Sequence, residues 1–310
     1  MLNIYEAQAL NRRKSFVVVS LFFIFVGISL YFLLNAFGYY YGLRSGNVAI
    51  LFPAFAFSGL FSFLGYYFSD SLVLAISGAK EADKKNFFDF YSVTENLSIG
   101  AGIPMPKLYV INDSAPNAFA TGRDPKHAVI CATTGLLEKL NRSELEGVIA
   151  HEMSHIKNFD TRLQTVVAIM AGLVALLGDW LLRGRYGFRK SSNNDDDNNL
   201  GGIFMLIGII FAVLSPIIAK LIQLAISRKR EFLADSGSVS ITHQPSGLIA
   251  ALKKISNDQE PLEAANKATA HLYIVSPFKG KIHGGVDWFS NLFNTHPPIG
   301  ERIKALGKMS

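Results

Sequence analysis

Cysteine is almost absent from this chain of 310 residues, because Cys131 is the only one. A single cysteine excludes an internal disulfide and any cysteine-rich metal site, and it is consistent with a reducing compartment. Charge is also scarce, since only 17% of the residues are Asp, Glu, Lys or Arg. The formal net charge of +6 comes from scattered Lys and Arg without a nucleic-acid-binding pattern. The sequence therefore predicts no nucleic-acid partner.

Hydrophobic residues are abundant instead. They make up 50% of the chain, which contains 24 Phe, and the mean hydropathy is +0.27. This composition predicts a membrane protein that contacts the lipid bilayer. Two nearly uncharged runs, 16–37 and 48–68, are long enough to cross a bilayer, since about 20 apolar residues suffice. The first run is too long and bulky for a signal peptide, so we interpret it as a retained anchor.

Basic residues flank these two runs on the same side. They are Arg12, Arg13 and Lys14 before the first run, and Lys80, Lys84 and Lys85 after the second. The short turn between the runs holds only Arg44. By the positive-inside rule, the runs form a hairpin whose two flanks are cytoplasmic. The segment that follows residue 75 is therefore expected to face the cytoplasm.

A second hydrophobic hairpin is predicted further along the chain, with runs at 163–182 and 203–226. The loop between them contains a low-complexity Ser, Asn and Asp run and is predicted to be disordered over 190–200. Two full spans would leave four basic residues outside, against the positive-inside rule. We favour two spans, and a partly embedded hairpin stays open. The predicted parts are thus 1–75, 76–162, 163–226 and 227–310.

The segments outside the hydrophobic runs predict a mixed domain. Residues 87–99 and 299–306 have helical patterns, and 107–111 is typical of a strand. Residues 117–121 and 127–131 are expected to pair as a hairpin through a Gly- and Pro-containing turn. The last strand before the next helix could offer its edge to an extended peptide or be an ordinary protected edge. The fold class predicted is α+β, mainly α-helical and integral to a membrane, with a small sheet.

The pattern His151-Glu152-Met153-Ser154-His155 is the strongest chemical signal in the chain. On a helix, residues four apart lie on one face, so both imidazoles can reach one ion. A helix is expected here, begun by a capping box of Ser143 and Glu146 and carrying apolar residues at helical spacing. The alternative is two surface histidines on an ordinary amphipathic helix. A catalytic zinc site also needs a third protein ligand.

Residues 227–235 offer that third ligand. Glu231 and Asp235 share one face of a predicted helix, so Glu231 could bind zinc while Asp235 accepts a hydrogen bond from a histidine ring. A solvated helix in which Glu231 pairs with neighbouring basic residues is the alternative. The remaining histidines His243, His271 and His283 lack a partner at ligand spacing and are expected at the surface.

Five motifs together give the sequence a family resemblance. The chain resembles the HtpX family of membrane-embedded zinc metalloproteases, which are distantly similar to the endopeptidases that process prenylated CAAX proteins. The matching motifs are Pro104-Met-Pro-Lys-Leu-Tyr-Val110, Asn117-Ala-Phe-Ala-Thr-Gly122, His151-Glu-Met-Ser-His-Ile-Lys-Asn-Phe-Asp160, Ser227-Arg-Lys-Arg-Glu-Phe-Leu-Ala-Asp235 and Thr295-His-Pro-Pro298. They occur in the family's order.

The resemblance implies a zincin-like catalytic domain that holds one zinc ion per chain. The implied zinc ligands are His151, His155 and Glu231, and Glu152 is the implied catalytic base. The implied substrate-binding edge strand is Asn117, Ala118 and Phe119. His296 is the implied residue near the reacting carbonyl, and we consider Arg302 as a second candidate for stabilising the oxyanion.

The resemblance also implies a cellular location and a biological role. It implies a multi-pass protein of a bacterial cytoplasmic membrane that degrades misfolded or damaged membrane proteins as part of a stress response. A site-specific processing protease for lipidated proteins is an alternative, and so is a catalytically silent membrane scaffold. The presence of both Glu152 and Glu231 argues against the scaffold.

Overall fold

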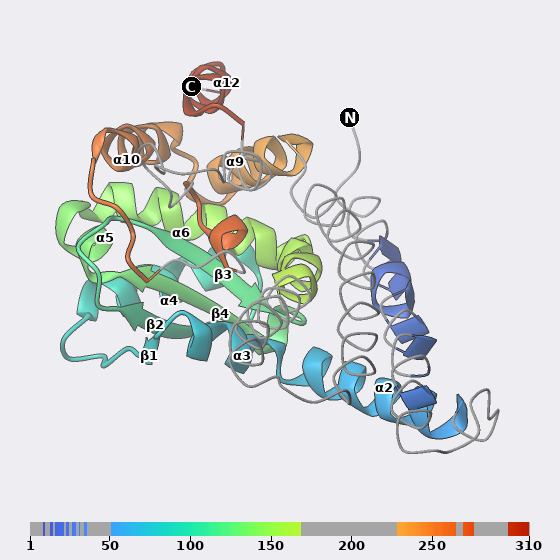
Figure 1. Cartoon of the computed structure of the whole chain (residues 1–310). Coiled ribbons are helices and arrows are strands. Elements are labelled where there is room, and N and C mark those ends of the chain that lie inside the picture. The colour runs from blue at the N-terminus through green and yellow to red at the C-terminus, as the bar shows by residue number, and fades with distance from the viewer. Residues whose placement is uncertain are drawn as a thin grey trace, which may run out of the picture.

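The structure, a computed structural model, describes residues 51–168, 228–264, 269–275 and 297–309, together with scattered positions between 9 and 35. Much of the predicted first span, nearly all of the second hydrophobic hairpin with its loop, and both His283 and His296 lie outside the described residues. The described part is mostly helical with one small sheet, as the sequence predicts (Figure 1).

The sheet has four strands in the order β1-β2-β4-β3. The strands are β1 (Lys80–Glu81), β2 (Lys107–Ile111), β3 (Ala118–Gly122) and β4 (Ala128–Thr133). Strands β2 and β4 are parallel, whereas β3 pairs antiparallel with β4 in the predicted hairpin. The short 3₁₀ helix η2 (Pro125–His127) closes this hairpin, and the Asp124 side chain caps it. Strand β3 is thus an edge strand, whereas β4, the last strand before α6, pairs on both sides, so the expectation of an edge at that strand is wrong.

Helix α6 (Arg142–Lys157) follows β4 and the short helix α5 (Thr134–Lys139). Its capping box consists of Asn141 and Glu144, with bonds of 3.0 and 2.8 Å, so the prediction of Ser143 and Glu146 is wrong by two residues. The helix begins early because Asn is as good an N-cap as Ser. Lys254 also holds the Glu144 carboxylate at 2.7 Å.

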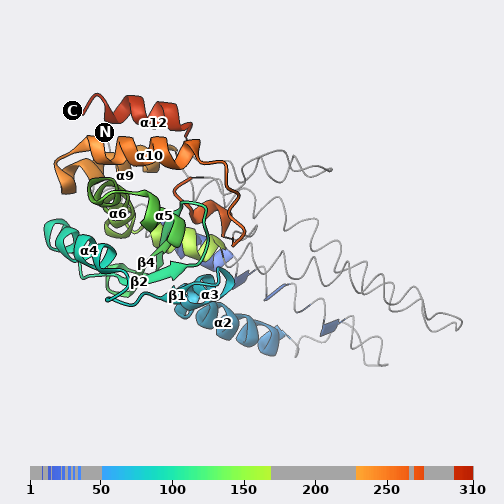
Figure 2. The ribbon, with the colours of Figure 1, turned by 90° about the vertical axis from the view of Figure 1, so that its left-hand side faces the viewer.

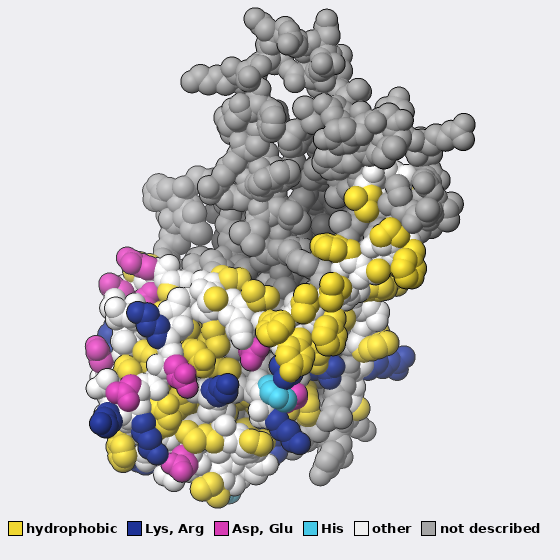
Figure 3. Space-filling view, turned by 90° about the horizontal axis from the view of Figure 1, so that it is seen from below, with side chains coloured by type: hydrophobic (Ala, Val, Ile, Leu, Met, Phe, Trp, Pro, Cys, Tyr) yellow, Lys and Arg dark blue, Asp and Glu magenta, His cyan; other side chains and the backbone are white. Residues whose placement is uncertain are grey.

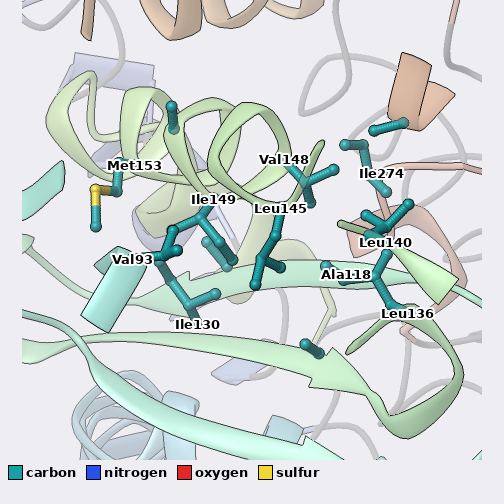
Figure 4. Packing of buried hydrophobic residues seen from close by; sticks show 14 of the residues in the cluster. Val93, Ala118, Ile130, Leu136, Leu140, Leu145, Val148, Ile149, Met153 and Ile274 are labelled. Atoms are coloured by element: carbon teal, nitrogen blue, oxygen red, sulfur yellow. The ribbon is translucent and has the colours of Figure 1, made fainter. Parts of the chain in front are cut away.

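The core lies between α6 and the sheet. Leu145, Ile149 and Met153 line the lower face of α6 and are fully buried against Ile130 of β4 and Val93 of α4 (Figure 4). Helix α4 (Phe88–Ala101) matches the predicted helix, and Gly102 ends it in the left-handed conformation with φ of 67°. The apolar face predicted for α6 is therefore confirmed.

Three C-terminal helices cover the other side of α6. Helices α9 (Arg228–Thr242) and α10 (Pro245–Asn257) lie on α6, and α12 (Ile299–Leu306) lies above them (Figures 1 and 2). Gly147 allows the close approach, because a Cβ there would meet the backbone nitrogen of Leu248 at 2.4 Å. Side chains on this face of α6 are consequently buried rather than solvated.

Helices α2 (Leu51–Tyr67) and α3 (Ser69–Ile76) lead into the sheet from the opposite side. Large apolar side chains are exposed along them, including Phe52, Phe57, Leu60 and Phe63, and Figure 3 shows hydrophobic side chains gathered on this side. Within the described ranges, no single helix is long and apolar enough to cross a membrane. Residues Phe55–Tyr67 and α3 pass that test only together, as a pair bent by 69°.

Candidate active site

His151 and His155 lie one turn apart on the face of α6 that α9 covers. They are only 1% and 5% exposed, and their Nε2 atoms are 3.2 Å apart. Leu145, Ile149 and Met153 occupy a different face, so the histidines lie off the apolar stripe as predicted. The alternative of two surface histidines fails because α9 packs over them.

Glu231 comes from the first turn of α9 and is 1% exposed. Its Oε2 lies 3.8 Å from His151 Nε2, and its Oε1 lies 3.6 Å from His155 Nε2. One ligand atom from each of the three residues can be chosen so that all lie within 4.8 Å of one another. The solvated-helix alternative for Glu231 therefore does not hold, and the three side chains can together hold a metal ion.

Each of the two histidines has a carboxylate next to its Nδ1 atom. His151 Nδ1 is 3.0 Å from Asp235 Oδ1, as the spacing of Glu231 and Asp235 predicts. His155 Nδ1 is 3.0 Å from Asp160 Oδ2, a contact that the sequence analysis missed. Such carboxylates fix the ring so that Nε2 points to the metal position.

The backbone turn after α6 places Asp160 next to His155. Phe159 has a φ of 59°, an uncommon value for a residue other than glycine, and this turn precedes the completely buried Asp160. The available signals were an acidic residue five positions after the second histidine and its place at the end of the family motif 151–160. Sequence spacing could not supply the positive φ that makes the contact possible.

Arg302 of α12 reaches the same cluster and is fully buried. Its guanidinium makes a forked contact with Asp235, with Nη2 to Oδ1 at 2.7 Å and Nε to Oδ2 at 2.9 Å. Its Nη1 donates to the carbonyl of Ile274 at 3.2 Å. Arg302 thus links α12 to the carboxylate that orients His151, and its Nη2 is also 3.4 Å from His151 Nε2.

Glu152 follows His151 on α6 and is 2% exposed. The backbone N–H of Ala120 on β3 donates to its carboxylate, which places Glu152 against the edge strand. Burial raises the pKa of Glu152 to about 7. The charge of His155 lowers this pKa, and the charge of Glu231 offsets part of that lowering. A carboxylate with this pKa can accept and release a proton near neutral pH.

The two histidines differ in their proton affinity. Burial and the nearby Arg302 charge lower the pKa of His151 to about 4. Burial also favours neutral His155, but the hydrogen bond to Asp160 and the charge of Glu231 outweigh it and raise the pKa of His155 to about 9. The pKa values of the two imidazoles are therefore shifted in opposite directions.

Comparisons with known proteins show the family of this chain. The model of "Peptidase family M48" matches residues 85–310. The chain belongs to peptidase family M48. It is 45% identical over 308 residues to the "Protease HtpX homolog" of Caldanaerobacter subterraneus subsp. tengcongensis, covering 99% of this chain and 98% of the relative. The protein of the same name from Dictyoglomus thermophilum is 44% identical over 305 residues, covering 98% and 94%.

A solved structure titled "Crystal Structure of S. mikatae Ste24p" is more distant. It has 19% identity and a TM-score of 0.48, and the match covers 97% of this chain and 67% of that one. The match to the family model and the HtpX relatives show that this M48 peptidase is a metalloprotease. The predicted resemblance to the HtpX family is confirmed.

The predicted substrate-binding residues of this M48 peptidase lie at the start of β3. The Asn117 amide donates to the carbonyl of Val275 at 3.0 Å, and the Ala118 carbonyl accepts from the Ile274 N–H at 2.9 Å. The Phe119 ring is buried and meets the Tyr273 ring edge-on, with centroids 5.1 Å apart. These backbone and side-chain groups are thus engaged by residues 273–275.

His271 is not at the surface, so that prediction is wrong. It lies in the 3₁₀ helix η3 (Ala270–Leu272), is fully buried, and has its Nε2 3.2 Å from the carbonyl of Gln164. Its polar sequence neighbours suggested exposure, but η3 packs against β3, and its Leu272 lies in one apolar cluster with Phe119 and Ala168. His243 is exposed, as predicted.

Proposed function

We propose that this M48 peptidase is a zinc-dependent endopeptidase whose metal ligands are His151, His155 and Glu231. The observation that carries the proposal is the convergence of two imidazole nitrogens and one carboxylate oxygen within 4.8 Å. Two histidines and a glutamate form a donor set that suits catalytic zinc, which keeps one further position open. Asp235 and Asp160 support the fit because each holds the far nitrogen of one histidine.

Bound zinc would supply a Lewis acid that polarises the scissile carbonyl and makes a water molecule more acidic. Glu152 takes the proton of the attacking water as its hydroxyl adds to the carbonyl carbon. Glu152 then gives that proton to the amine nitrogen as the carbon–nitrogen bond breaks. Its burial and its place against Ala120 hold the carboxylate beside the cluster and away from bulk solvent.

Arg302 serves this site mainly through Asp235 in our proposal. Its forked contact fixes the carboxylate that orients His151, and a guanidinium is well suited to such a two-bond contact. The Nη2 atom also lies close enough to His151 to contribute positive potential where the oxyanion develops. His296 remains our candidate for the direct donor to the oxyanion.

We further propose that the substrates are unfolded or damaged proteins of a bacterial cytoplasmic membrane. The hydrophobic composition and the exposed aromatic side chains of α2 support a multi-pass membrane protein. The basic flanks of the hydrophobic runs support a catalytic domain that faces the cytoplasm. Substrates in the same membrane would then reach the sheet from the side of α2 and α3.

The third ligand provides the test of the zinc site. The purified wild-type chain is expected to hold about one zinc per chain, and Glu231→Ala to lose or weaken it because two histidines leave an incomplete shell. Glu301→Ala, at an exposed position of α12, is the matched control and should keep the metal. Full zinc content and full peptidase activity in Glu231→Ala would show that the ligand assignment is wrong.

A further inference from the structure

Two arginines from distant parts of the chain meet the end of α2. The guanidinium carbon of Arg123 lies 4.4 Å from the centre of the Tyr67 ring, and its Nη1 donates to the Tyr67 carbonyl at 3.0 Å. The guanidinium carbon of Arg162 lies 5.4 Å from the centre of the Tyr66 ring. Two consecutive tyrosines of α2 therefore each have a positive charge over the ring.

The turn after β3 brings the two arginines together. Arg123 directly follows Gly122, whose N–H donates to Thr165 Oγ1 at 3.3 Å. Thr165 lies three residues after Arg162 in the helix of residues 160–168, so the two side chains are neighbours on that helix. The end of β3 and this helix thus meet beside the tyrosines, and their arginines approach α2 together.

Positive charge predominates at this junction. The turn that holds Arg123 also contains Lys126, which is exposed, and His127, whose side chain is 48% exposed. The carboxylate of Asp124 lies in the same turn, with Oδ1 2.8 Å from His127 Nδ1 and Oδ2 3.9 Å from Arg123 Nε. With Arg162 added, the basic side chains outnumber this carboxylate even when the histidine is neutral.

The junction also lies where two hydrophobic runs end at the catalytic domain. Tyr66 and Tyr67 are at the end of the run 48–68, and Arg162 directly precedes the run 163–182. Exposed apolar side chains continue from α2 into α3, and Figure 3 shows Lys and Arg side chains beside that hydrophobic surface. Tyr and Arg at the end of an apolar run are typical of the membrane–water interface, where lipid phosphates lie.

Both guanidinium groups have donors to offer to a phosphate. Arg162 Nε is buried and has no hydrogen-bond partner within the described part of the chain. A buried N–H without an acceptor is unfavourable, and a phosphate oxygen is an acceptor that guanidinium groups bind well. The contact of Arg123 with the Tyr67 carbonyl uses one donor of a guanidinium that has several.

We infer that Arg123 and Arg162 bind the phosphate of an anionic phospholipid headgroup between the end of α2 and the turn after β3. A zwitterionic headgroup carries its own cation, so the surplus positive charge favours a lipid with a net negative charge. Because β3 also contacts Glu152 through Ala120, the lipid holds the active site at the bilayer surface. This inference rests on the proposed membrane location and is independent of the peptidase chemistry.

The test counts the lipids that the purified full-length chain retains in native mass spectrometry from detergent. The probes are phosphatidylglycerol, which is anionic, and phosphatidylcholine with the same acyl chains, which has no net charge. One basic residue at an anionic lipid surface strengthens binding by about fivefold, so two arginines should give phosphatidylglycerol a dissociation constant about 25-fold lower. An excess of inorganic phosphate should not displace the lipid, because it lacks acyl chains that contact α2.

Charge-matched variants show whether the two arginines form the site. Arg123→Gln combined with Arg162→Gln should remove most of the preference for phosphatidylglycerol. Lys253→Gln combined with Lys304→Gln, at exposed positions of α10 and α12, removes the same charge and should keep the preference. Thermal unfolding in detergent checks that each variant folds. If the arginine variant does not fold, Lys126→Gln replaces it and should lower the preference by about fivefold.

Each outcome decides a different point. Equal binding of the two lipids by the wild type would overturn the site, and so would a preference that the folded variant leaves unchanged. Displacement of the lipid by inorganic phosphate would show a site for soluble phosphate instead. A wild type that floats with vesicles of neither lipid contradicts the proposed membrane location, and the site fails with it. A wild type that floats with both but retains no phosphatidylglycerol contradicts the site alone.

Discussion

Single carboxylates determine how the two histidines present their metal-facing nitrogens. Asp160 accepts from His155, and Asp235 does the same for His151 while also binding Arg302. The two partners are equivalent in distance but differ in their arginine contacts, because Asp235 has a forked contact with Arg302 whereas Asp160 Oδ1 lies 3.8 Å from Arg230 Nε. Asp160 is the position at which we measure what such an orienting carboxylate contributes.

Asp160→Asn should weaken zinc binding by roughly 10- to 100-fold, the usual effect of removing the partner of a ligating histidine. Competition with a chromophoric chelator measures the affinity. Asp89→Asn is the control, since that carboxylate is exposed and far from the histidines in the sequence. An Asp160→Asn affinity equal to that of the control would mean that the His155 contact does not orient the ring for metal binding.

Residue-level prediction worked where chemistry is encoded in local spacing and failed where it depends on tertiary contacts. His151, His155 and Asp235 have helical spacing to their partners, so their positions on one face could be predicted. Asp160 depends on the positive φ of Phe159, and the burial of His271 depends on packing against β3. Neither feature has a periodic signal in the sequence.

The start of α6 is the element-level feature that positions the site. Asn141→Ala removes the side-chain oxygen that accepts from the Glu144 N–H, and it should lower the free energy of unfolding by about 1 kcal/mol. Ser143→Ala should change it by less than about 0.5 kcal/mol, because Ser143 lies inside the helix and is exposed. Thermal unfolding of the two variants in detergent compares them directly. A larger loss for Ser143→Ala would favour the cap expected from the sequence.

Elements were predictable when their apolar pattern was clear. The strand 107–111 and the helix 299–306 have the predicted bounds, and the hairpin and the helices that carry the ligands are also present. Their three-dimensional arrangement was not predictable from periodicity. The histidine face is buried by α9, whose Ser238 hydroxyl donates to the Gly147 carbonyl of α6 from 91 positions away in the chain. Gly147 also lets α10 approach α6 closely.

Orientation in a membrane is a property of the whole molecule. The basic flanks predict that residues 76–162 face the cytoplasm. Lys85→Cys should therefore be inaccessible to a membrane-impermeant maleimide in intact cells and react after the membrane is opened. Cys131 should contribute little background because it is fully buried. Labelling of Lys85→Cys from outside intact cells would reverse the predicted orientation.

A second cysteine within 191–199 extends this experiment to the second hydrophobic hairpin. Labelling from outside would support two full spans at 163–182 and 203–226. Protection from outside would support a partly embedded hairpin. Either result concerns residues 163–226 and leaves the assignment of His151, His155 and Glu231 as metal ligands unchanged.

Glu152 is proposed to move the proton during peptide hydrolysis without binding the metal. Turnover of an unfolded membrane protein by the wild type and by Glu152→Gln, at equal zinc content, tests it most directly. Gln is nearly isosteric but cannot accept the proton, so activity should fall by about 10²–10⁴-fold while the metal is retained. Glu146→Gln, on the exposed side of the same helix, should remain as active as the wild type. Equal turnover by Glu152→Gln and the wild type would contradict the account.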